Sequence, residues 1–235
     1  MNLYLKFVFI FFIGCTLGWI IELFFRRIVH GRWVNPGFLI GPYLPIYGFG
    51  LTALTFIYLL FRNVNLNSVI IVILMGIIMT FIELIGGLIG IKNNIKLWDY
   101  SDRWCNYKGI ICPLFSLIWT LIGALYYFFL ASYVMSALDW FGNNIAFSYI
   151  LGLFTGLILI DTVYSTKLYL KIRKYAKENN VTIIYEHFKM HIKDVQLKAK
   201  EKYSFINPFK QTKALLDYLS DYKDYIIDKI NKINL

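Results

Sequence analysis

The chain has 235 residues, of which 58% are hydrophobic, 19% are aromatic and only 16% are charged. This composition and a mean hydropathy of +0.58 exclude a single water-soluble domain and indicate several membrane spans. A formal net charge of +10 would favour nucleic acid in a soluble protein, but here the basic residues gather in connections and in the C-terminal part, where such residues orient helices and meet anionic lipid. We therefore expect membrane lipid, and no nucleic acid, as a partner.

Apolar stretches of nearly the length that crosses a bilayer, roughly 20 residues, follow one another along the first 170 residues. The first continues past Cys15 without a break, which argues against a cleaved lipoprotein signal. The sequence thus predicts an all-α integral membrane protein with a five-helix transmembrane domain over residues 1–170. Its spans are expected at about residues 3–25, 43–61, 68–91, 110–135 and 145–164.

The connections between these stretches indicate the orientation. Seven Lys and Arg residues lie after the first and third stretches, whereas the connections after the second and fourth hold only Arg62. The positive-inside rule then places the N-terminus outside and the C-terminus inside, in the cytoplasmic membrane of a bacterial-type cell.

A pattern of Arg, Trp and Asn followed by Pro occurs twice, at residues 32–42 and 103–113. Each copy follows an apolar stretch that carries one glutamate, Glu22 or Glu83. This duplication predicts a parallel two-helix internal repeat, with both copies of the motif on the cytoplasmic side.

Each helix that is expected to run inward carries one acid at membrane depth: Glu22, Glu83 or Asp161. Because an ionised side chain there costs at least about 2.5 kcal/mol, such residues normally face a cavity or a partner. For Glu22, a local ion pair with Arg26 one turn away is an alternative to a role in a site. The acids are candidates for binding a cation or proton, or for lining a path.

Three prolines and three glycines interrupt the apolar segment 35–48, so it cannot be regular helix throughout. In both copies of the repeat a proline stands where a helix can begin, and a helix N-terminus favours anions. We expect these entries to meet an anionic group such as a lipid phosphate or a carboxylate. An ordinary helix entry, with the arginines at bulk headgroups, is the alternative. The candidate residues are Arg32, Arg103, Asn35 and Asn106.

A polar and aromatic cluster precedes the second copy. It consists of Trp98, Asp99, Tyr100, Ser101 and Asp102. The aromatic residues are typical of a membrane interface. The two aspartates are expected mainly to pair with arginines, and an acid or metal ligand at the membrane surface is the alternative.

Residues 171–235 form the predicted second domain, a basic, helical cytoplasmic tail with 14 Lys and Arg against 8 Asp and Glu. Two helices are expected, broken at Asn207-Pro208. In the second helix apolar residues recur at helical spacing opposite an acidic face, which favours packing on another protein segment. His187 and His191 have metal-ligand spacing but no third ligand, so neither a metal nor a cofactor is expected.

Several short motifs in the membrane region are specific. They are Gly14-Cys15, Gly18-Trp19 with Glu22, Gly41-Pro42, Pro45-Ile46-Tyr47-Gly48, Glu83 with Gly86, Trp98-Asp99-Tyr100-Ser101, and Asn106 with Gly109 to Pro113. Together they resemble the family called putative ABC-transporter type IV, or CmpB-like, over residues 7–164. The resemblance implies a small polytopic permease and supplies no substrate and no catalytic residues. The chain has no G-x-x-x-x-G-K-[ST] loop, so ATP hydrolysis would come from another polypeptide.

The sequence thus predicts a permease or transporter component that handles an anionic or lipid-like group at the cytoplasmic face. Five helices enclose little room, so a homo-oligomer or a partner subunit is expected. One alternative is a membrane-embedded enzyme acting on a lipid, with Glu22, Glu83, Asp99 and Asp102 as acid, base or metal ligands. Another is a sensor or scaffold that acts through its tail.

Overall fold

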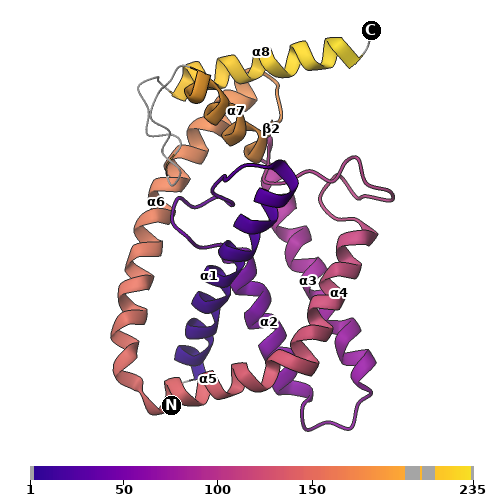
Figure 1. Ribbon diagram of the computed structural model, residues 1–235, viewed down its shortest axis with the longest axis vertical. Helices are drawn as coiled ribbons and strands as arrows, with labels where there is room; N and C mark the ends of the chain where they lie inside the picture. The colour runs from indigo at the N-terminus through magenta and orange to yellow at the C-terminus, as the bar shows by residue number, and fades with distance from the viewer. Residues whose placement is uncertain (1–2, 199–206, 208–214, 234–235) are drawn as a thin grey trace.

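The computed structural model describes residues 3–198, 207 and 215–233. Helices α1, α2, α3, α4 and α6 run roughly along the long axis of the molecule, and α7 and α8 lie across one end (Figure 1). We call this end the tail end and the opposite one the far end. In chain order the elements are α1 Leu3–His30, α2 Pro45–Phe61, α3 Ser68–Ile91, β1 Ile95–Lys96, α4 Pro113–Leu125, π-helix η1 Tyr126–Leu130, α5 Ala131–Asn143, 3-10 helix η2 Ile145–Phe147, α6 Ser148–Glu178, β2 Ile183–Ile184, α7 Tyr185–Lys198 and α8 Leu215–Ile233.

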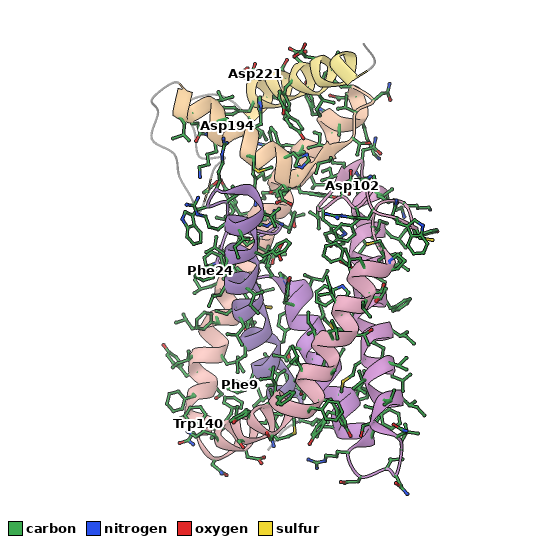
Figure 2. All side chains as sticks on the ribbon, turned by 45° about the vertical axis from the view of Figure 1, so that its right-hand side comes forward. Phe9, Phe24, Asp102, Trp140, Asp194 and Asp221 are labelled. Atoms are coloured by element: carbon green, nitrogen blue, oxygen red, sulfur yellow. The ribbon has the colours of Figure 1, made fainter. Side chains whose placement is uncertain are left out.

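Four helical runs are long and apolar enough to cross a membrane: Leu3–Val29, Ser68–Ile91, Pro113–Asn143 and Ile145–Glu178. Helix α2 is also apolar, but its 17 residues place it at the short end of the range of roughly 17–25 residues for a spanning helix. The chain is an all-α, multi-pass membrane protein. The labelled aspartates lie toward the tail end, and the labelled aromatic residues lie along the bundle below them (Figure 2).

The fourth apolar stretch differs from the predicted span 110–135. Its helix begins at Pro113, passes through the π-helical turn Tyr126–Leu130 and continues to Asn143. Helix α5 then runs across the far end instead of along the axis of α4 (Figure 1). A π-helical turn widens the helix and commonly accompanies a change of direction. Periodicity cannot reveal such a bend, because both sides of it are apolar.

Helix α6 is also longer than the predicted span. It continues without a break past residue 164 to Glu178, through the expected domain boundary at 170. Its last turns stay helical because Ile172 and Ala176 are buried in a core formed with the tail. The chain then pairs β2 with β1 in parallel, with Ile95 opposite Ile183. The division into two domains stays a prediction.

The tail folds back on its own chain. In α8, Leu219 and Tyr222 belong to the apolar face that the helical spacing predicted, and they are buried against Phe188 and Ile192 of α7, with Leu215 and Ile226 packed around them. The break predicted at Asn207-Pro208 falls where only Asn207 is described, outside any helix. The apolar face of α8 is therefore covered, at least in its first half, by the protein itself.

Helices α1 and α2 pack closely, as do α3 and α4, because small residues lie between them. A Cβ atom on Gly18 would lie 2.2 Å from the Tyr47 side chain, and one on Gly76 would lie 2.1 Å from Thr120. Such small residues let membrane helices approach each other. The two helix pairs carry Glu22 and Glu83. The two-helix repeat and the N-out, C-in orientation stay predictions.

Candidate functional site

Glu83 on α3 is the most buried of the three acids, with 3% of its surface exposed. The Tyr100 hydroxyl donates to its Oε1 at 3.0 Å, and the Trp119 indole N–H donates to its Oε2 at 2.9 Å. No Lys, Arg or His forms an ion pair with Glu83 within the described part of the chain. The loop 92–112 and helix α4 thus supply neutral donors to this carboxylate.

Glu22 on α1 has different partners. Its Oε1 lies 3.1 Å from Nη2 of Arg26, the ion pair expected from the spacing of one turn, and its Oε2 accepts a hydrogen bond of 2.9 Å from Tyr47 on α2. Arg26 is itself buried and also pairs with Glu186 of α7. This triad of two acids and one base reaches from the membrane helices into the tail.

Glu22 and Glu83 lie at one shared cavity of about 1170 Å³ between the membrane helices. The two carboxylates are close enough to interact electrostatically. The aromatic rings of Tyr47, Tyr100 and Trp119 line the cavity beside them, and the Tyr47 and Trp119 rings meet edge to face at 6.0 Å. We call these five side chains the polar end of the cavity.

The Tyr100 phenol shows the electrostatic character of the polar end. Burial raises its pKa above the usual value, and the negative charges of Glu83 and Glu22 raise it further. A phenol that stays protonated can keep donating its hydrogen bond to Glu83.

The rest of the cavity is apolar. Phe49, Phe81 and Ile89 line it, and their side chains remain about half exposed on helices long or apolar enough for a membrane. Apolar side chains that lack protein neighbours at this depth face lipid. The cavity therefore has an apolar wall that reaches the lipid-facing surface.

Asp161 on α6 lies apart from this pair and holds the loop 31–44. It accepts the backbone N–H groups of Ile40, at 3.2 Å, and Gly41, at 2.7 Å, and the hydroxyl of Ser165. Irregular backbone at membrane depth needs such internal partners. Asp161 thus anchors this loop, and its role in binding a cation or proton stays a prediction.

The repeat asparagines also serve their loops. The Asn35 side chain accepts a hydrogen bond from Trp19 and donates to the carbonyl of Ile40, both at 2.7 Å. The Asn106 amide donates to the carbonyl of Arg103 at 2.9 Å and accepts the N–H of Gly109 at 2.8 Å. These bonds stabilise the two loops directly.

Arg32 and Arg103 lie at the tail end, away from the cavity lining. Arg32 pairs with Asp194 of α7, and Arg103 lies 3.8 Å from Asp102. Both arginines are about half exposed. A contact with an anionic headgroup at this surface stays a prediction.

The predicted interfacial cluster is divided by the structure. Tyr100 joins the polar end, and Trp98 lines the cavity and donates to the carbonyl of Ile110 at 2.8 Å. Asp99 lies 3.0 Å from Lys96 and accepts from Ser101. Burial opposes the ionisation of Asp99, but the hydrogen bonds from Ser101 and Lys96 prevail and lower the pKa of its carboxyl.

Sequence reasoning did not identify the contributions of Tyr47, Trp119 and Glu186. Tyr47 lies in the Pro-Ile-Tyr-Gly motif, which marked it as specific without indicating which acid it meets. Trp119 lies in an apolar stretch and carried no signal. In the described ranges no group of three or more His, Cys, Asp and Glu side chains is arranged to hold a metal ion.

Apolar helices around a cavity with two carboxylates at its polar end define a multi-pass membrane protein with an internal cavity. A model of the family described as putative ABC-transporter type IV matches residues 9–166, so the chain belongs to that family, as its motifs predicted. The protein is thus a member of a family of transporter components. No curated protein and no solved structure matches the chain.

Proposed function

We propose that the protein is the membrane component of a transporter and that the cavity between its helices receives a lipid-like substrate. The observation that carries this proposal is the cavity of about 1170 Å³, at or above the upper end of typical ligand sites, roughly 300–1,000 Å³. Its apolar wall suits an acyl chain or a similar body, and its polar end suits a head with hydrogen-bonding groups.

The half-exposed residues along the cavity support entry from the membrane. A substrate that comes sideways from the bilayer keeps its apolar part in an apolar medium throughout, so it avoids the cost of crossing water. Arg32 and Arg103 contact anionic headgroups at the tail end in this proposal, which puts that end at the cytoplasmic face of the cell membrane.

A second copy or a partner subunit completes the assembly. The most hydropathic 18-residue part of the run Ile145–Glu178 is only 6% buried inside the structure, so α6 offers a long uncovered face. Any energy from ATP comes from a separate ATPase polypeptide, because the chain has no phosphate-binding loop.

The test compares lipid and small-metabolite profiles, and the distribution of lipids between the two membrane leaflets, in cells that lack the protein and are complemented with wild type, Glu83→Gln or Asp139→Asn. Asp139 is a suitable control because it is an exposed acid that pairs with Lys6 on α1, away from the cavity. We expect wild type and Asp139→Asn to restore the distribution of one lipid-like species between the membrane leaflets, and Glu83→Gln to fail. If the purified protein in detergent instead converts that species into another compound, the protein is an enzyme and the transport proposal is wrong.

A further inference from the structure

We infer that the polar end of the cavity recognises the cationic head of an amphiphile, an organic ammonium ion joined to an apolar body. This inference rests on the proposed function because it places the ligand in the same cavity. What it adds is the charge of the ligand's head.

The first argument is charge. The ionisable acids and bases that line the cavity are Glu22, Arg26 and Glu83. Arg26 is committed to Glu22 and to Glu186 of the tail. Glu83 has only neutral donors in the described structure, so no basic side chain of the lining is paired with it. A cation placed here supplies the missing partner, whereas an anion would meet two carboxylates.

The second argument is the ring arrangement. Tyr47, Tyr100 and Trp119 line the cavity, and each donates a hydrogen bond to one of the two carboxylates. Phe115 is stacked on one face of Tyr100, with the ring centroids 4.2 Å apart. Aromatic faces attract organic cations, and several faces together form the cage that recognises substituted ammonium groups. A cage also suits a diffuse organic cation better than a hard metal ion, which needs several oxygen ligands at once.

The third argument is the connection between the polar end and the apolar wall. Glu83 and Ile89 lie on the same helix, α3, and line the same cavity together with Phe81 and Phe49. A head held by Glu83 therefore has an apolar channel beside it for its body. The Thr52 hydroxyl also lines the cavity and has no hydrogen-bond partner within the described residues, so it offers a further polar contact.

The experiment measures saturable binding of radiolabelled dodecyltrimethylammonium to the purified full-length protein in an uncharged maltoside detergent. We expect wild type and Asp139→Asn to bind equally, and Glu83→Gln to bind at least about tenfold more weakly. Uncharged dodecanol should compete poorly. Equal binding by wild type and Glu83→Gln, or competition by dodecanol as strong as by the unlabelled cation, would overturn the inference.

A second variant guards against misfolding of Glu83→Gln. Trp119→Leu removes the ring and keeps Glu83, and it should also weaken binding of the trimethylammonium probe. Far-UV circular dichroism and elution as a single species check that each variant is folded. If folded Trp119→Leu binds as wild type does, the aromatic cage is not the recognition element and the inference fails.

Competition also separates two sources of the same chemistry. An amine-bearing lysophospholipid that competes as well as the probe indicates a membrane aminolipid, whereas competition only by dodecylamine indicates a free amphiphilic amine. Both results uphold ammonium recognition. If the protein restores the lipid distribution in cells but does not distinguish the cation from dodecanol, this inference is refuted and the transport function stands. If the protein binds the cation specifically but has no effect on the lipid distribution in cells, the transport function is refuted and this inference stands.

Discussion

Arg26 on α1 forms a buried ion pair with Glu186 on α7, so a membrane helix and the tail are joined by opposite charges. The same guanidinium group contacts Glu22 at 3.1 Å in the cavity wall. Any ligand that changes the charge around Glu22 therefore acts on the contact that holds the tail. This relationship provides a physical route by which the tail can respond to the occupancy of the cavity.

We expect Glu186→Gln to loosen the tail by roughly 1–3 kcal/mol, since a hydrogen-bonded charge in a buried setting is lost. Hydrogen exchange of the amides of α7 should then rise. Asp194→Asn is the matched control, because it removes an acid from the same helix, but its pair with Arg32 is about half exposed. Its effect should stay below about 1 kcal/mol. Equal exchange in the two variants would contradict the role of the buried pair.

Lys189 on α7 makes the tail contact dependent on pH. Its Nζ donates to the carbonyls of Asn35 at 3.1 Å and Gly37 at 2.7 Å. Burial and, to a smaller extent, the positive charge of Arg26 lower the pKa of Lys189 from 10.5 to about 7, against the opposing effect of Glu186 and Asp161.

Between about pH 7 and 10.5 the unfolded chain therefore binds a proton on this lysine that the native protein does not. The free energy of unfolding of wild type, relative to that of Lys189→Met, should rise with pH in this window by at most about 1.4 kcal/mol per pH unit, and it should not change below pH 7. Thermal unfolding from pH 6 to 9.5 measures the difference. Lys174→Met, which changes an exposed lysine, should follow wild type. A difference that falls with rising pH would refute the assignment.

Gly18→Ala should displace Tyr47 from Glu22, because the new Cβ would lie 2.2 Å from the Tyr47 side chain near its own Cβ. Overpacking of this kind typically costs about 1–3 kcal/mol. Gly152→Ala on α6 provides the comparison, since nothing lies within 4 Å of its new Cβ. Its unfolding temperature in detergent should equal or slightly exceed that of wild type. If Gly18→Ala and Gly152→Ala unfold at the same temperature, Gly18 does not lie in a close contact between α1 and α2.

Cys105 provides a test of orientation. It is exposed, whereas Cys15 and Cys112 are buried, so a polar maleimide should label Cys105 alone in the folded protein. With the expected N-out, C-in topology, labelling should occur in inverted membrane vesicles and be absent in intact spheroplasts. Cys105→Ser should abolish it. Labelling in spheroplasts would reverse the predicted orientation.

The sequence predicted an all-α membrane protein because the signal of a spanning helix is a long apolar run, which its length alone identifies. Four helical runs are long enough to span, and the number of five spans stays a prediction. It also singled out Glu22, Glu83 and Tyr100, since polar groups are rare at membrane depth. What it could not predict is which partners these residues share. Trp119 meets Glu83 from 36 positions away, and an indole within an apolar helix resembles any other core residue.

The packing of the tail could also be predicted only in part, for a different reason. The period of α8 predicted an apolar face that needed a cover, and Leu219 and Tyr222 do lie in a core. Periodicity cannot name the covering segment, which here comes from α7 and from the end of α6. The continuation of α6 to Glu178 depends on that tertiary contact, so local composition suggested a boundary where the helix has none.

The pairing of Ile95 with Ile183 has a consequence for biosynthesis. These two strands are parallel and are separated by α4, α5 and α6, so the chain must cross the bilayer and return before they can meet. Contacts between such distant positions form late, because the entropy of closing the intervening loop opposes them. The pairing therefore forms only after the intervening helices have been inserted, and a chain that stalls before then leaves the backbone N–H and C=O groups of β1 without their partner strand.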